Sequence, residues 1–261
     1  MIFAYLMTGL VVGVLAGLLG IGGGGVVVPS LLWVFAAQHV VAASRVHLAI
    51  GTSLATIIFT ASAAIRAQQK RGAIDWAVVR VMAPAALVGS LVSGYMAGWI
   101  DASALRLIFA ICLFLIGVQL VASWRPRGHW HLPSRLALFA AGLVIGAVSA
   151  LIGIGGGSLT VPFLSACNVD MKRAIAISTT LGLPIALFGA LGFVLAGWSA
   201  PGRPDWSVGY VYLPALFGVT AVSILAAPLG VRWSHRLPVA TLKRGFGILL
   251  LLVSFQILHG S

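Results

Sequence analysis

Two stretches of this sequence decide its fold, Gly20-Ile21-Gly22-Gly23-Gly24-Gly25-Val26-Val27-Val28-Pro29 and its near copy Gly153-Ile154-Gly155-Gly156-Gly157-Ser158-Leu159-Thr160-Val161-Pro162. Each interrupts a long apolar segment, since residues 1–37 and 136–166 contain no Lys, Arg, His, Asp or Glu. Glycine disfavours a helix by about 1 kcal/mol relative to alanine, so each copy predicts a helix break. Non-helical backbone at membrane depth is tolerated only inside protein or beside water. Two breaks at matching places of two halves indicate the substrate site of a transporter.

The composition predicts an all-α polytopic membrane protein. The chain is 61% hydrophobic and only 8% charged, whereas soluble domains are about 25% charged. Several apolar runs reach the roughly 20 residues that a spanning helix needs, and the short alternating segments of a β-barrel are missing from the sequence. The net charge of +12 comes from residues in short loops rather than from one basic face, so we expect no nucleic-acid partner.

The chain divides into two related halves within one integral membrane domain. We expect a first repeat over 1–123, a linker over 124–135 and a second repeat over 136–261. After the glycines, His47-Leu48-Ala49-Ile50-Gly51-Thr52-Ser53-Leu54 is echoed by Ala174-Ile175-Ala176-Ile177-Ser178-Thr179-Thr180-Leu181. The predicted apolar segments are 2–19 with 26–37, 47–65, 77–99, 104–123, 136–152 with 159–166, 174–198, 208–230 and 241–258.

The basic residues predict how these segments cross the membrane. If all eight segments crossed once, each side would carry eight Lys and Arg residues. If the two glycine-broken segments instead enter and leave on the same side, thirteen basic residues lie on one side of the membrane. The other side then carries three: Arg45, Arg106 and Arg203. Because basic loops stay in the cytoplasm, the second arrangement is favoured. It predicts two inverted repeats, each a glycine-broken helical hairpin plus three transmembrane helices, with a cytoplasmic linker and both termini periplasmic.

The sequence resembles the sulfite exporter TauE/SafE family over nearly its whole length. The resemblance rests on the paired Gly-rich stretches with Pro29 and Pro162, on Ala-Ile-Gly-Thr-Ser-Leu at 49–54, and on the weaker copy at 176–181. It implies transport of sulfite, sulfonates or related anions across the bacterial cytoplasmic (inner) membrane. The second copies depart at Ser158 and at 178–180, which puts equivalence of the two half-sites in doubt.

The glycine breaks also predict an anion site. Helical arms that begin near Val26 and Leu159 would point their unpaired N–H groups and positive dipole ends at a cavity. Hydroxyls on the neighbouring spans would add donors. The alternative is that the glycines only permit close helix packing. The predicted substrate-binding residues are Gly22, Gly23, Gly24, Gly25, Thr52, Ser53, Gly155, Gly156, Gly157, Ser158, Thr179 and Thr180.

We therefore expect a secondary transporter that exports its substrate by alternating access. It would lie in a lipid bilayer, and a homo-oligomer is compatible with the sequence. A passive channel and a membrane-embedded enzyme are the alternatives. The spans contain no paired Asp, Ser/His pair or metal cluster, so we expect no catalytic residue, metal or cofactor. Asp170 is expected to start a helix and His47 to lie at the interface. Arg45 either attracts anions or caps its loop, and the sequence does not distinguish these two roles.

Overall fold

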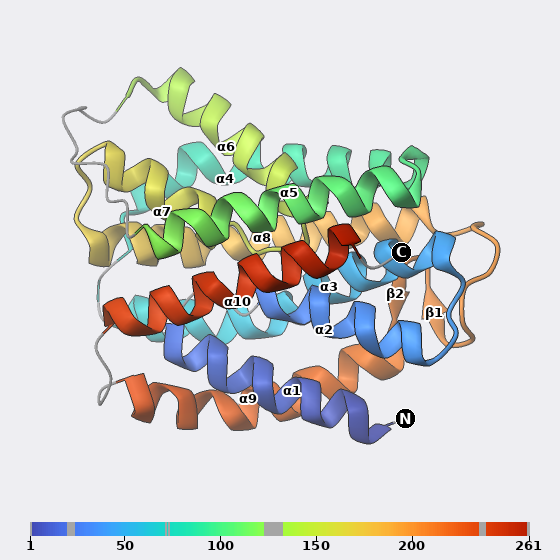
Figure 1. Ribbon diagram of the computed structural model, residues 1–261. Helices are drawn as coiled ribbons and strands as arrows, with labels where there is room; N and C mark the ends of the chain where they lie inside the picture. The colour runs from blue at the N-terminus through green and yellow to red at the C-terminus, as the bar shows by residue number, and fades with distance from the viewer. Residues whose placement is uncertain are drawn as a thin grey trace.

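A computed structural model describes residues 2–19, 24–70, 72, 74–122, 133–234 and 239–259. The described part is helical apart from one pair of short strands (Figure 1). Its elements are α1 (Ile2–Leu19), α2 (Gly24–Ala37), α3 (Ala42–Lys70), α4 (Trp76–Met96), η1 (Ala97–Trp99), α5 (Ala102–Val121), α6 (Arg135–Leu151), α7 (Gly157–Ala166), α8 (Met171–Ala196), β1 (Ser207–Val208), β2 (Val211–Tyr212), α9 (Leu213–Ser234) and α10 (Val239–His259).

The structure confirms an all-α membrane protein. In the described residues, four helices are long and apolar enough to cross a membrane: Ala42–Arg66, Trp76–Trp99, Ala102–Val121 and Met171–Ala196. The outside of the bundle is apolar as well, with large exposed side chains such as Leu225 at 77%. So much exposed apolar surface suits a bilayer and would be a liability in water.

Helix α3 is longer at both ends than the sequence predicts. We expected a connector up to residue 46 and a loop from residue 66, but the helix runs from Ala42 to Lys70. Alanine, arginine, glutamine and lysine, which occupy these ends, are good helix formers. The polar residues therefore mark where the chain leaves the apolar region, and the helix continues past that point.

The segment predicted over 208–230 begins differently from the expected helix. Ser207 pairs with Tyr212 and Val208 with Val211 in a tight antiparallel hairpin, and α9 starts only at Leu213. Gly209 has φ +57° and lies against the backbone of Val194, where a side chain would collide. Valine and tyrosine favour strands, and the glycine permits the turn.

Two helix pairs use closely spaced glycines for contact. Helix α1 packs along α9 and α6 packs along α4. Gly9 and Gly13 of α1 lie against the backbone of α9, and Gly142 and Gly146 of α6 lie against the backbone of α4. Glycines four residues apart allow such close approach in membranes. The packing interpretation thus holds for these glycines, which lie outside the two quoted stretches.

Figure 1 shows α1 and α2 running in opposite directions, α6 and α7 doing the same, and the N- and C-termini at one end of the bundle. Helix α3 is the most buried of the four long helices. The division into inverted repeats stays a prediction, and most of the predicted linker lies outside the described residues.

Candidate functional site

Helix α6 ends in a tight turn at the second glycine stretch. The Ile154 N–H donates to the carbonyl of Ser149 (3.0 Å) and the Gly153 N–H to that of Ala150 (3.2 Å). Gly153 has φ +67°. This pair of bonds with a left-handed glycine is the Schellman motif, which ends a helix cleanly and satisfies its last carbonyls. The predicted break is therefore present, over residues 152–156.

Three helices enclose this break. The Ser53 hydroxyl of α3 donates to the Gly153 carbonyl at 2.9 Å. A Cβ built on Gly24, the first residue of α2, would lie 2.9 Å from the same carbonyl. A Cβ on Gly182 of α8 would lie 2.8 Å from the Gly155 carbonyl. The start of α2 thus contacts the second glycine stretch, so the structure brings the two predicted stretches together.

Helix α7 begins at the break with a free amino-terminal end. Its N-cap, Gly156, has φ +74°, and the Thr160 N–H donates to the Gly156 carbonyl at 2.9 Å. The first N–H groups of a helix have no intrahelical acceptor, which leaves those of Gly157 and Ser158 available. The first turn has no acidic residue to neutralise the positive end of the helix dipole. Helix α7 starts two residues before the Leu159 that the sequence indicated.

Two buried hydroxyls without partners flank Gly156. Ser149 and Thr160 are both 0% exposed, and neither hydroxyl has a hydrogen-bond partner among the residues that the structure describes. A Cβ built on Gly156 would lie 3.6 Å from the Thr160 oxygen and 3.8 Å from that of Ser149. A buried hydroxyl without a partner is unfavourable by about 1–3 kcal/mol. Two of them beside one glycine, next to free N–H groups, form a set of donors that lacks its acceptor.

Ser149 and Thr160 are not among the site residues predicted from the sequence. They lie one helical turn before Gly153 and one turn after Gly156, so their spacing alone carried a signal. The same positions in the first stretch, counted from Gly20, are Ala16 and Val27. The hydroxyl pair therefore belongs to the second half only.

The first glycine stretch is described in part. Gly22 and Gly23 lie outside the described residues, whereas Gly24 and Gly25 form the buried start of α2. A Cβ on Gly25 would meet Phe246 at 3.5 Å, so its surroundings are apolar. The described part of this stretch carries no hydroxyl donor.

The four predicted hydroxyls all make hydrogen bonds within the protein. Thr52 accepts a bond from the Tyr212 N–H at 3.0 Å, which ties α3 to the strand hairpin. Ser53 holds the Gly153 carbonyl, as described above. Thr179 and Thr180 each donate to the carbonyl four residues earlier in α8, both at 2.8 Å. Their role as substrate ligands stays a prediction.

The remaining polar residues have structural roles that the sequence only partly indicated. Asp170 caps α8 by accepting from the Lys172 N–H, which confirms it as a helix start. His47, predicted to lie at the membrane interface, is buried within the protein: it is 3% exposed, stacks on Tyr210, and its Nε2 lies 3.0 Å from the Ala97 carbonyl. Its ring fills a polar gap between α3 and η1, which no local pattern reveals.

Comparison with known proteins finds a family and relatives that cover most of the chain. The sequence profile described as Sulfite exporter TauE/SafE matches residues 5–257. A probable membrane transporter protein of Haemophilus influenzae is 36% identical over 252 residues, 96% of each chain. A probable membrane transporter protein of Methanocaldococcus jannaschii is 29% identical over 234 residues, 89% of this chain and 86% of that one. Among solved structures, none matches the chain significantly.

Proposed function

The chain belongs to the sulfite exporter TauE/SafE family and is a multi-pass membrane transporter rather than an enzyme, and from this premise we propose that it is a secondary exporter of sulfite, a sulfonate or a related small sulfur-containing anion. The anion would bind at the amino-terminal end of α7. Alternating access of two inverted halves would then carry it across the membrane. The membrane would be the bacterial cytoplasmic membrane, with both termini periplasmic.

One observation carries the substrate class: the unpaired, fully buried hydroxyls of Ser149 and Thr160 beside Gly156. A sulfite or sulfonate group presents three oxygen acceptors. The two hydroxyls and the N–H groups of Gly157 and Ser158 supply donors to match them. The helix end adds positive potential without a charged side chain, as anion sites at helix N-termini do.

The closure of this site favours a carrier over a channel. Ile57 and Ile185 contact the glycines of the break, and both hydroxyls are shut off from solvent. An anion therefore reaches the donors only if helices move apart. The glycine contacts of α1 with α9 and of α6 with α4 are consistent with two related halves, because each half supplies one partner to each pair.

Counterflow in proteoliposomes tests this function. Vesicles of purified protein are loaded with unlabelled sulfite, sulfate, thiosulfate, sulfoacetate or taurine and placed in trace labelled anion. A carrier exchanges one for the other, so at least one sulfur anion should accumulate transiently above its equilibrium level. A passive channel only equilibrates the label. Equilibration without accumulation, or no flux for any of these anions, would reject the proposal.

A further inference from the structure

One buried titratable side chain has no part in the anion site proposed above. His47 lies near the start of α3 and is 3% exposed. Its Nε2 lies 3.0 Å from the carbonyl oxygen of Ala97 and 3.2 Å from that of Ile100. A carbonyl only accepts hydrogen bonds, so Nε2 carries the proton of the neutral ring. Nδ1 is then the unprotonated nitrogen, and it is buried without a hydrogen-bond partner among the described residues.

His47 joins α3 to the strand hairpin, because its ring stacks on that of Tyr210 with the centroids 4.8 Å apart. A Cβ on Gly51, one turn further along α3, would collide with the Tyr210 carbonyl. The Thr52 hydroxyl accepts a hydrogen bond from the Tyr212 N–H. Figure 1 shows the hairpin at the end of the bundle where both termini lie. The His47 ring therefore holds two elements, η1 and the hairpin, against one end of α3.

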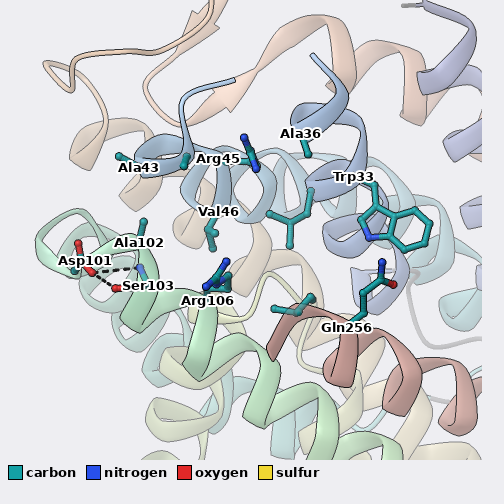
Figure 2. A pocket seen from close by; sticks show the side chains of 13 residues that line it. Trp33, Ala36, Ala43, Arg45, Val46, Asp101, Ala102, Ser103, Arg106 and Gln256 are labelled. Atoms are coloured by element: carbon teal, nitrogen blue, oxygen red, sulfur yellow. Dashed lines mark hydrogen bonds between the residues drawn. The ribbon is translucent and has the colours of Figure 1, made fainter. Parts of the chain in front are cut away.

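Several ionisable side chains share this end of the bundle with the His47 ring. The elements around the ring carry His39, Arg45, Asp101, Arg106, Arg203, Asp205 and Tyr210 there. Figure 2 shows Asp101 bonded to Ser103, and these bonds, chiefly from the Ser103 hydroxyl, hold the pKa of the Asp101 carboxyl below its ordinary value. That carboxylate favours a positive ring, whereas the arginines oppose one. Among these residue types, histidine is the one whose charge changes between pH 5 and 8 in water.

We propose that His47 is a proton-binding site whose neutral ring latches the hairpin and η1 to α3. The neutral ring donates from Nε2 and needs no partner at Nδ1 that donates to it. Protonation adds an N–H and a positive charge at Nδ1, where the described residues supply no acceptor. Burial of such a group without an acceptor is unfavourable. The protonated ring is therefore more stable in water, and low pH releases the hairpin and η1 from α3.

The proton comes from the end of the bundle where both termini lie. A cavity of about 550 Å³ is found there, and its lining includes the residues next to His47 and Ile100 in the sequence, Val46 and Asp101 (Figure 2). The second repeat has a buried alanine, Ala174, at the position that matches His47. The proton site is therefore present at one end only, which is the periplasmic end in the orientation proposed above.

Helix α3 connects this latch to the anion site. Ser53, which donates to the Gly153 carbonyl of the glycine break, directly follows Thr52, which accepts from the hairpin. In the proposed transport cycle, release of the hairpin would free the outer end of the helix that holds the break. This role in the cycle rests on the proposed function, whereas proton binding by His47 does not.

Amide hydrogen exchange tests the proposal on the protein in phosphatidylcholine nanodiscs without any transported anion. If only the released ring binds a proton, near the ordinary histidine pKa of about 6.5, the opening equilibrium rises about tenfold between pH 8 and pH 5.5. The protection factor of the hairpin amides, corrected for the intrinsic effect of pH on exchange, should fall by that factor. An unchanged or higher protection factor at pH 5.5 would overturn the proposal.

His47→Gln removes the titration and keeps a donor. Its side-chain amide can still donate to the Ala97 carbonyl, so hairpin protection should be equal at both pH values. His39→Asn is the matched control, because His39 is an exposed histidine at the same end and its φ of +55° suits asparagine. It should keep the tenfold change, and so should Tyr210→Phe, which keeps the ring stack. A tenfold change in His47→Gln, or its loss in either control, would place the proton elsewhere.

A measurement on the parent protein keeps the proposal testable if His47→Gln does not fold. Val46-His47 is the only Val-His pair in the sequence, so labelling with ¹³C-valine and ¹⁵N-histidine assigns its NMR signal without a substitution. At pH 8 the ring should be protonated at Nε2 alone, and it should gain a proton at Nδ1 over the pH range in which the hairpin loses protection. A ring that stays neutral while the hairpin opens, or becomes charged while the hairpin stays protected, would reject the latch.

Discussion

Replacing Thr160 by valine removes the hydroxyl but keeps the shape of the side chain. That hydroxyl is 0% exposed and has no hydrogen-bond partner within the described part of the chain. Its loss leaves no group unsatisfied, and it relieves a penalty of about 1–3 kcal/mol. We therefore expect the ligand-free variant to be at least as stable as the parent. Ser149→Ala should behave in the same way.

The transported anion should stabilise the variant less than it stabilises the parent. Losing a hydrogen bond to a charged group costs about 1.5–3 kcal/mol, or roughly ten- to a hundred-fold in affinity. An anion at a hundred times its dissociation constant stabilises the parent by about 2.7 kcal/mol. At the same concentration the stabilisation of Thr160→Val should fall to about 1.4 kcal/mol for a tenfold loss and to about 0.4 for a hundredfold loss. Thermal unfolding with and without anion measures both states.

Ser165→Ala is the matched control. Ser165 lies near the other end of α7 and its hydroxyl is also buried without a partner. Its removal should leave anion-dependent stabilisation intact. The reasoning is refuted if Thr160→Val and Ser149→Ala are stabilised by the anion as strongly as the parent. It is also refuted if both variants unfold more easily without anion, because the hydroxyls would then have structural partners.

Four further outcomes follow from the same contacts. Gly156→Ala should lower the free energy of unfolding by about 1–2 kcal/mol, because the φ of Gly156 is +74°. Gly245→Ala, in a helix with open space around it, should not lower it. Equal denaturation curves for the two variants would contradict this. Ser53→Ala should cost about 1–3 kcal/mol of stability by leaving the Gly153 carbonyl unpaired, and an unchanged melting temperature would show that another group satisfies it. Gly146→Ala should destabilise the protein by about 1–3 kcal/mol through a clash with the Ala86 backbone, unless α4 and α6 can separate, in which case the unfolding curve would not move. A reporter that works only in the cytoplasm should be inactive at the C-terminus, and an active fusion would disprove the inverted arrangement.

The sequence predicted the features that depend on local chemistry. Four apolar helices long enough to span, the break after Leu151 and the cap at Asp170 follow from hydropathy, glycine and capping rules. The ends of α3 were missed because hydropathy reports where the chain leaves the apolar region, and the helix continues beyond it. The hairpin before α9 was missed because Val208 and Val211 are apolar in either structure.

The site was harder to predict because it depends on contacts between distant residues. Ser53 was predicted to bind substrate, but its hydroxyl meets a carbonyl 100 positions away. Ser149 and Thr160 lie on either side of the helix break, and the geometry of its turn brings their hydroxyls close to Gly156. His47 is buried by η1, which follows 50 residues later. Only the fold determines which hydroxyls are engaged and which are left without partners.

The most direct test of the anion site is a crystal structure with a bromine-labelled sulfonate, such as 2-bromoethanesulfonate. The anomalous signal of bromine locates the anion without assumptions about its pose. We predict a sulfonate group at the start of α7, within hydrogen-bond distance of the Ser149 and Thr160 hydroxyls, and no such signal in crystals of the Thr160→Val, Ser149→Ala double variant. A bromine signal only at other places, with no anion at the glycine break, would contradict the account.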